Sequence, residues 1–211
     1  MIKTFVVNLA HSTERKKYME TLLKEVSIEY EFFPAVYGKE IKNLDEVYDK
    51  ERALKTIKRE LNLGEIGCAL SHRAIYKKMI DENIRQALIL EDDIEILPHF
   101  FEVYQVLSSL DVGNKIILLG TNATKRKKMI WKKKLTDTHS MYLVLNSYAG
   151  TYGYVIGLKA AKKIYGHSDK VFLTADEWKY YRRLSQIWLV SPSIVRAKEI
   201  FLSEIGDTLR H

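Results

Sequence analysis

The sequence predicts an α/β fold, a single domain with a Rossmann-like, mainly parallel twisted sheet flanked by helices. Short runs rich in β-branched residues alternate along the chain with longer segments whose apolar residues recur at helical spacing. One apolar run, residues 86–90, ends abruptly in Glu91-Asp92-Asp93, as a buried strand does at the ligand-binding edge of an open α/β sheet. No repeat or low-complexity linker divides the 211 residues, so one compact domain over residues 1–211 is expected.

The first part of the chain predicts two strands and three helices before the acidic run. Residues 2–9 and 28–36 are the expected strands, and Ser12 or Thr13 can cap the helix between them. The apolar positions of that helix are Tyr18, Met19, Leu22, Leu23 and Val26. A charged helix is expected from Asn43 through Leu61, ended by Gly64, with Val47, Leu54, Ile57 and Leu61 on its inner face. The next helix runs from Gly67 through Met79 and leads into the 86–90 strand.

The second part continues the alternation. Pro98 is expected to open a helix that buries Phe101, Tyr104 and Leu107, and residues 115–119 form the following strand. Residues 141–145 and 152–156 are predicted strands, in part an antiparallel addition, and residues 158–165 and 174–184 are predicted helices. A last strand is expected at 187–190. Repeated βα units imply helices on both faces of the sheet.

The composition indicates a globular chain, because 46% hydrophobic and 29% charged residues are typical of a folded protein. No apolar stretch is long enough to cross a bilayer, and the chain passes from Met1 directly into a strand pattern. A cytoplasmic location is therefore expected. Cys68 is the single cysteine, so no internal disulfide can form, and a small packing residue is expected there rather than a nucleophile.

Three consecutive carboxylates at a strand end indicate a cation site. Glu91, Asp92 and Asp93 repel one another unless a cation or several hydrogen-bond donors neutralise them. Hard divalent ions with oxygen ligands, Mn²⁺ or Mg²⁺, are the natural partners of such a group. On the tripeptide alone, a solvated acidic turn is an equal alternative.

The residues upstream of the acids bear a family resemblance. The segment Gly64-Glu65-Ile66-Gly67-Cys68-Ala69-Leu70-Ser71-His72 precedes Ile89-Leu90-Glu91-Asp92-Asp93 by about twenty residues. This combination resembles glycosyltransferase family 25, the bacterial lipooligosaccharide and lipopolysaccharide galactosyltransferases. The resemblance extends to residues 5–9, to Glu14-Arg15, to residues 150–161 and to Asp176-Glu177-Trp178, which are looser matches.

The resemblance implies a GT-A-like, metal-dependent, inverting β-galactosyltransferase that moves galactose from UDP-galactose to a lipooligosaccharide or lipopolysaccharide core sugar. Asp93 and Glu91 are then the metal ligands for Mn²⁺ or Mg²⁺. The implied base for the acceptor hydroxyl is Asp176, with Glu177 as second choice. The expected nucleotide-sugar-binding residues are Asn8, Leu9, Arg15, Gly67, Ser71, His72, Glu91 and Asp92.

Each of these assignments has a plainer alternative. Arg15 could decorate an amphipathic helix, and His72 could be a satisfied structural group. Asp176-Glu177 could open a helix capped by Thr174 and pair with its dipole. The aromatic residues Trp178, Tyr148, Tyr152 and Tyr154 could stack on acceptor sugars, although core packing is the commoner role.

The basic segment 125–134 carries seven cations in Lys-Arg-Lys-Lys-Met-Ile-Trp-Lys-Lys-Lys. It is expected to be a solvated loop or a contact with an anionic membrane, such as the inner face of the bacterial inner membrane. No nucleic-acid-binding motif accompanies it, so nucleic acid is not an expected partner. A UDP-sugar donor and a glycolipid or oligosaccharide acceptor are the expected partners.

Two other functions stay open on the residues alone. The acids could serve a different metal-carboxylate enzyme, although the chain has no Gly-rich phosphate loop of the P-loop kinases. A polyanion- or membrane-binding module without turnover is the other. Residues 203–206 resemble a family segment near the donor site and lie close to the last residue, so a C-terminal truncation is left open.

Overall fold

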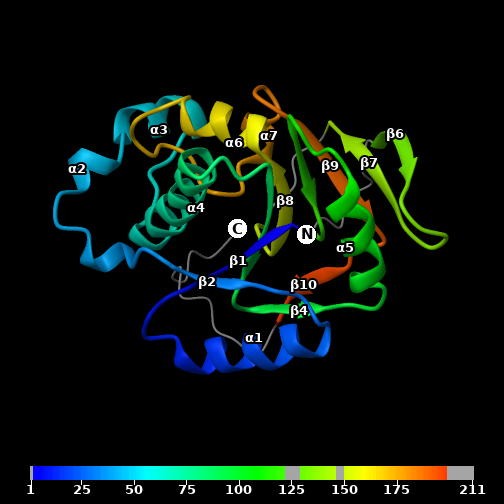
Figure 1. Ribbon diagram of the computed structural model, residues 1–211. Coiled ribbons are helices and arrows are strands. Elements are labelled where there is room, and N and C mark those ends of the chain that lie inside the picture. Colours follow the sequence, from blue (N-terminus) through cyan, green and yellow to red (C-terminus); the bar gives the residue numbers. More distant parts are fainter. Residues whose placement is uncertain (1, 122–128, 146–149, 199–211) are drawn as a thin grey trace.

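The computed structural model describes residues 2–121, 129–145 and 150–198. Within them, a central eight-stranded sheet carries helices on both faces (Figure 1). Its strands, in spatial order, are β2 (Glu31–Pro34), β1 (Lys3–Asn8), β3 (Gln86–Glu91), β8 (Gly153–Gly157), β5 (Lys115–Leu118), β9 (Gln186–Ser191), β7 (Ser140–Val144) and β6 (Met129–Lys134).

Most strands of the sheet point the same way. β1 is parallel to β2 and β3, and β5 is parallel to β9. β8 lies antiparallel between β3 and β5, and β7 lies antiparallel between β9 and β6. Six strands (β2, β1, β3, β5, β9 and β6) therefore share one direction, and β8 and β7 are reversed. This arrangement confirms the predicted α/β class and the predicted antiparallel addition.

Alternate residues of each inner strand serve two separate cores, which explains their continuous apolar runs. In β3, Leu88 and Leu90 pack with α1 (Thr13–Glu25) and α5 (Phe100–Ser109) on one face. Ala87 and Ile89 pack on the other face with α4 (Leu63–Asp81), α6 (Leu158–Tyr165) and α7 (Trp178–Tyr181). Figure 1 shows α4, α6 and α7 above the sheet and α1 below it.

Helix α4 begins earlier than the sequence predicted. Asn62 and Glu65 form a reciprocal capping box, so Gly64 lies in the first turn and does not end a preceding helix. Gly67 lies within the helix, and position 67 requires a glycine because the backbone of residues 36–38 passes very close to it. A Cβ at Gly67 would be 2.5 Å from the Val36 carbonyl oxygen and 2.8 Å from the Gly38 nitrogen. The short helix η1 (Gly38–Glu40) follows this close approach.

The prediction of a single helix over residues 43–61 is wrong. The chain forms α2 (Leu44–Val47) and α3 (Lys50–Ile57), with an extended break at Tyr48. Tyr48 is buried, pairs with Val171 and accepts a hydrogen bond from the Leu61 N–H through its hydroxyl, while Asp49 caps α3. Leu54 is 41% exposed instead of facing inward. Contacts with a distant segment therefore override the helical pattern.

Other local differences come from tertiary contacts and turns. The helix expected over 174–184 is reduced to α7, with Glu177 at its N-cap. Helix α5 begins at Phe100, which is buried, whereas Phe101 is 42% exposed. Strands β4 (Ile94–Ile96) and β10 (Val195–Ala197) form a separate antiparallel pair that was not predicted. Residues 129–134 of the expected basic loop form strand β6.

Among the described residues, no helix has the length and apolarity needed to cross a bilayer.

Candidate functional site

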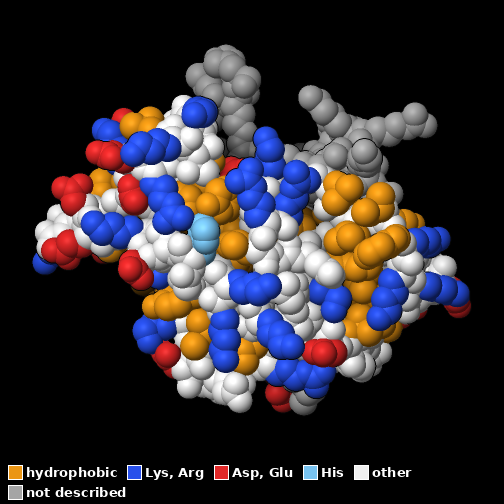
Figure 2. Space-filling view, turned by 90° about the horizontal axis from the view of Figure 1, so that it is seen from above, with side chains coloured by type: hydrophobic (Ala, Val, Ile, Leu, Met, Phe, Trp, Pro, Cys, Tyr) orange, Lys and Arg blue, Asp and Glu red, His pale blue; other side chains and the backbone are white. Residues whose placement is uncertain are grey.

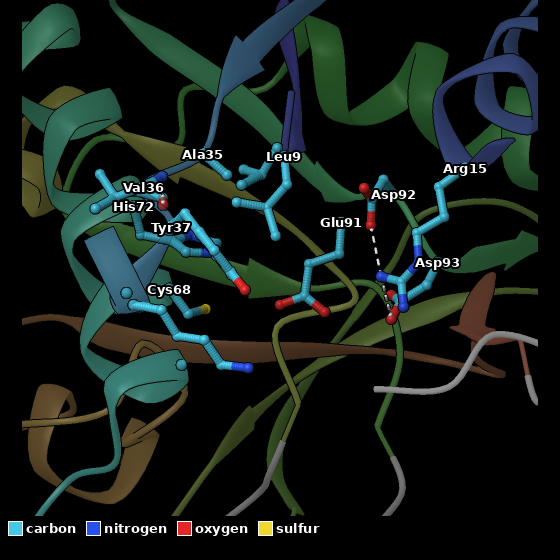
Figure 3. Close-up of a pocket in the computed structure, with 15 residues that line it drawn as sticks. Leu9, Arg15, Ala35, Val36, Tyr37, Cys68, His72, Glu91, Asp92 and Asp93 are labelled. Atoms are coloured by element: carbon cyan, nitrogen blue, oxygen red, sulfur yellow. Dashed lines mark hydrogen bonds and ion pairs between the residues drawn. The ribbon is translucent and has the colours of Figure 1, made fainter. Parts of the chain in front are cut away.

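A pocket lies where the carboxyl ends of β1, β2 and β3 meet the first turns of α4. The parallel register places Val7 of β1 beside Glu91 of β3, so the residues that follow both strands lie at one edge of the sheet. Figure 3 shows Glu91 and Cys68 in the pocket, with Asp92, Asp93 and Arg15 at its other end. The predicted residues that line it are Leu9, Arg15, Ser71, His72, Glu91, Asp92 and Asp93.

Asp92 is held by protein donors. The Asn8 side-chain amide donates to its carboxylate at 2.7 Å, and Arg15 donates at 3.0 Å (Figure 3). Arg15 also reaches Asp93, with its Nη1 3.4 Å from Oδ2, and the Arg15 side chain is only 11% exposed. Arg15 therefore does not decorate the outside of its helix. It neutralises part of the acid cluster, while Asn8 acts behind the pocket by fixing Asp92.

Glu91 projects into the pocket among other acids (Figure 3). Burial raises the pKa of the Glu91 carboxyl well above its usual range, and the charges of Asp93, Asp176 and Asp92 raise it further, whereas Arg15 lowers it. The Thr151 hydroxyl donates a hydrogen bond to Glu91. Glu91 and Asp93 thus offer carboxylate oxygens in a strongly negative region, a donor set that suits Mn²⁺ or Mg²⁺.

Ser71 and Gly67 shape the wall of the pocket. The Ser71 hydroxyl donates to the Gly67 carbonyl at 2.7 Å and accepts from the Val36 N–H at 2.8 Å. The hydrogen bond from the Val36 N–H to Ser71, together with the close approach of the backbone at Gly67, fixes residues 36–38 against α4. Both predicted residues therefore position the pocket wall. Gly67 meets backbone on its open side rather than the pocket.

His72 is buried and neutral. Its exposed fraction is 1%, and burial lowers its pKa to about 4. Nδ1 lies 2.6 Å from the Tyr154 hydroxyl, which lies 2.7 Å from the Tyr76 hydroxyl. Nε2 has no hydrogen-bond partner among the described residues. His72 is thus anchored to the core by the hydrogen bond at Nδ1, whereas the hydrogen-bonding capacity of Nε2 is unsatisfied among the described residues.

The two candidate bases lie in different surroundings. Asp176 accepts a hydrogen bond from the Gly150 N–H at 2.8 Å, and its charge acts on both Glu91 and His72. Glu177 lines a separate depression with Lys58, Lys179 and Arg183. Burial and the Asp176 charge raise the pKa of Glu177. The charge of Asp176 therefore acts on the acid cluster, although neither Asp176 nor Glu177 is among the residues that line the pocket.

The predicted aromatic platforms are mostly core residues. Trp178 is 1% exposed and Tyr154 is fully buried. The Trp178 indole donates to the Gly150 carbonyl at 3.1 Å, so it supports the segment that also binds Asp176. Tyr152 is half-buried and packs against a core cluster. Tyr148, residues 125–128 and residues 203–206 lie outside the described residues.

Sequence reasoning did not identify several pocket residues. Tyr37 and Lys39 line the pocket beyond the end of β2, and the Tyr37 ring packs edge-on against His11 at 4.8 Å. The acids were identified because they are polar residues directly after a predicted strand of the parallel sheet. The same criterion could have indicated Tyr37 and Lys39, which follow the strand predicted over residues 28–36. No local pattern links Thr151 to Glu91, because they meet only through the β3–β8 pairing.

The comparisons with known proteins identify the class. Residues 1–178 match "Glycosyltransferase family 25 (LPS biosynthesis protein)", and the chain belongs to this family. A "Glycosyltransferase 25 family member" of Drosophila pseudoobscura pseudoobscura is 34% identical over 76% of the chain and 26% of that protein. "Procollagen galactosyltransferase 1-A" of Xenopus laevis is 29% identical over 83% of the chain and 30% of that protein. The chain thus spans less than a third of the length of these relatives.

A solved structure shows a weaker likeness. The crystal structure of mannose-1-phosphate geranyltransferase from Thermus thermophilus aligns with 90% of the chain and 73% of that protein at 9% identity and a TM-score of 0.43. At this distance the alignment carries no argument about function. The family assignment follows from the sequence match.

The raised pKa of Glu91 predicts that this carboxyl destabilises the metal-free protein as pH rises. Because the folded state binds the proton more tightly than the unfolded state, the contribution of Glu91 to stability is present at low pH. It is lost as pH rises through the folded-state pKa. Glu91→Gln should therefore raise Tm in metal-chelating buffer at pH 8 and change it little near pH 4. Thermal unfolding of both proteins across this range measures the difference; a constant difference at every pH would contradict the assignment.

Proposed function

We propose that this chain is the catalytic domain of a metal-dependent, inverting β-galactosyltransferase that uses UDP-galactose. The observation that carries the proposal is the pocket at the carboxyl edge of β1, β2 and β3, which Glu91 and Asp93 enter from one side and α4 bounds on the other. The family match and the relatives named as galactosyltransferases support the sugar transfer. The family description as an LPS biosynthesis protein supports a lipooligosaccharide or lipopolysaccharide core sugar as acceptor.

Each side of the pocket offers groups for one part of the donor. Asp93 and Glu91 would hold Mn²⁺ or Mg²⁺, which would neutralise the charge of the departing diphosphate. Arg15, fixed by Asp92, presents a guanidinium beside this position, and Lys39 adds a second cation in the pocket lining. Leu9, Ala35 and Val36 give apolar lining between the ends of β1 and β2, where a nucleoside would be bound.

Asp176 is the proposed base. An inverting transfer needs a carboxylate that takes the proton from the acceptor hydroxyl while its oxygen attacks the anomeric carbon. The Gly150 N–H orients the Asp176 carboxylate, and the Trp178 indole bound to the Gly150 carbonyl steadies that N–H. Glu177 lines a different depression, so we assign it no proton-transfer step.

The metal assignment is tested with Asp93→Ala. Asp93 contributes little to the core and much to the negative charge of the pocket, so the variant should stay folded and lose Mn²⁺-dependent UDP-galactose binding in isothermal titration. Asp111→Ala, which removes an exposed acid that is not among the pocket-lining residues, is the matched control and should bind like the parent. Unchanged Mn²⁺-dependent affinity in folded Asp93→Ala would reject this metal position. Measuring UDP release and transferred galactose in parallel separates a transferase from a phosphoryl-transfer enzyme or a binding module.

The base assignment is tested with Asp176→Asn, which retains shape and loses basicity. Turnover should fall by roughly 10²–10⁴-fold while donor affinity changes little, as expected for the loss of a general base. Asparagine can still accept the hydrogen bond from Gly150, so the local structure should be preserved. Glu177→Gln is the control and should retain most activity. The opposite pattern, with Glu177→Gln inactive and Asp176→Asn active, would transfer the role to Glu177.

We further propose that the transferase works at the cytoplasmic inner face of the bacterial inner membrane. Strand β6 is one of the two edge strands of the described sheet, and the Trp131 side chain, at a bulge in β6, is 72% exposed beside the exposed Lys132 and Lys133. A second cationic face lies over α6 and the residues after α7, where Lys163, Arg182 and Arg183 line a groove together with Leu143, Val144 and Leu145. Figure 2 shows Lys and Arg side chains gathered beside hydrophobic ones on the face seen from above.

The membrane contact is tested with vesicles that contain anionic lipid. Replacing Lys132, Lys133 and Lys134 with Gln should weaken association by ~3 kcal/mol at most, at ~1 kcal/mol per charge, and Lys134 should contribute least because Asp137 pairs with it. The loss should shrink as salt is added, since screening shortens the reach of these charges. Gln at Lys163, Arg182 and Arg183 tests the second face by the same assay. Equal loss of turnover on soluble and vesicle-bound acceptors would place the Lys132–Lys134 segment in the active site instead.

A further inference from the structure

Three potential metal ligands of unlike chemistry converge on the helix side of the pocket. Cys68 and His72 are four residues apart on α4, a spacing that places two side chains on the same face of a helix. Glu91 approaches them from the end of β3. One potential ligand atom from each of Cys68, His72 and Glu91 lies within 4.8 Å of the others. All three residues line the pocket, as Figure 3 shows.

The hydrogen bonds of His72 leave one of its nitrogens available to a ligand. Nδ1 lies 2.6 Å from the Tyr154 hydroxyl, and the Tyr154 hydroxyl lies 2.7 Å from that of Tyr76. If Nδ1–H donates to Tyr154 and Tyr154 donates to Tyr76, the lone pair of the imidazole is on Nε2. That atom is buried and has no partner among the residues that the structure describes. A histidine that binds a metal has this arrangement, with the other N–H donated to a supporting group.

The ligand set favours a different ion from the one that Asp93 favours. Thiolate and imidazole are ligands of softer ions such as Zn²⁺, whereas carboxylates alone suit Mn²⁺ and Mg²⁺. A tetrahedral Zn²⁺ site with bonds of about 2.0–2.3 Å holds its ligand atoms roughly 3.5 Å apart. Ligand atoms that lie within 4.8 Å of one another need to approach by little more than ~1 Å to reach that separation.

We propose that Cys68, His72 and Glu91 form a Zn²⁺ site beside the carboxylate site of Asp93. Binding forms a sulfur–zinc bond and releases the Cys68 thiol proton, together with any proton held by the Glu91 carboxyl, to solvent, and the fourth position of the ion stays open to water. Glu91 is common to this site and to the metal site of the proposed transferase. Because all three ligands line the donor pocket, bound Zn²⁺ should also compete with the nucleotide sugar; this consequence rests on the proposed function, whereas the binding itself does not.

Cobalt provides a direct readout, because Co²⁺ takes tetrahedral Zn²⁺ sites and its bond to a thiolate gives a charge-transfer band in the near ultraviolet. Cys68 is the single cysteine of the chain, so any such band reports this residue. Titration of the reduced protein with Co²⁺, without sugar donor, should give the band together with the visible bands of a tetrahedral ion. Addition of Zn²⁺ should abolish both.

Three variants decide whether the ligands are those proposed. Cys68→Ser should abolish the thiolate band. His72→Gln and Glu91→Gln should each weaken Co²⁺ binding by at least the roughly 10–100-fold that the loss of a group supporting a ligand costs, while circular dichroism confirms that each variant is folded. Asp93→Ala should retain the band, because Asp93 is no ligand here. Failure of the transferase proposal would leave the band intact. Absence of the band in the parent protein, or an unchanged band in folded His72→Gln, would overturn the Zn²⁺ site.

Discussion

The structure depends on how it accommodates three carboxylates at the end of one buried strand. Parallel pairing of β1 with β3 places Asn8 and the start of α1 beside these acids, and Asn8 and Arg15 then satisfy Asp92 and partly neutralise Asp93. Glu91 receives the Thr151 hydroxyl, among residues that raise its pKa. The fold therefore gives each acid at least one protein donor, most fully at Asp92, and directs Glu91 and Asp93 at a pocket where a cation or a ligand can complete the charge balance.

Helix α4 supplies the opposite wall of that pocket. Some of its residues hold a neighbouring segment in place, and others line the pocket. Ser71 and Gly67 hold residues 36–38 against the helix, which positions Tyr37 and Lys39 beside the pocket. Cys68 and His72, on the same helix, contribute side chains to the lining. Desolvation and nearby carboxylates raise the pKa of the Cys68 thiol. The motif Gly64 to His72 thus combines side chains that line the pocket with close backbone packing, and the close packing explains the small residues Gly67 and Ser71.

Sequence reasoning succeeded where one local pattern determines the element. The apolar runs of β1 and β3 and the periodicity of α6 predicted those elements closely, and the acids after β3 predicted the edge of the sheet where the pocket lies. It failed over residues 43–61, where burial of Tyr48 against Val171 interrupts the helix. Thr151 could not be found in advance, because its bond to Glu91 depends on the reversed strand β8 inserted between β3 and β5.

The pocket presents potential hard oxygen ligands on one side and potential sulfur and nitrogen ligands on the other, with Glu91 between them. An oxygen-preferring ion gains more beside Asp93, and a thiophilic ion gains more beside Cys68 and His72. Either ion would stabilise the ionised form of Glu91, whose pKa is otherwise raised, so the two proposed sites would compete for one carboxylate even though their remaining ligands differ. If both proposed sites form, the ion held near β3 depends on which ions are available as well as on the geometry of the pocket.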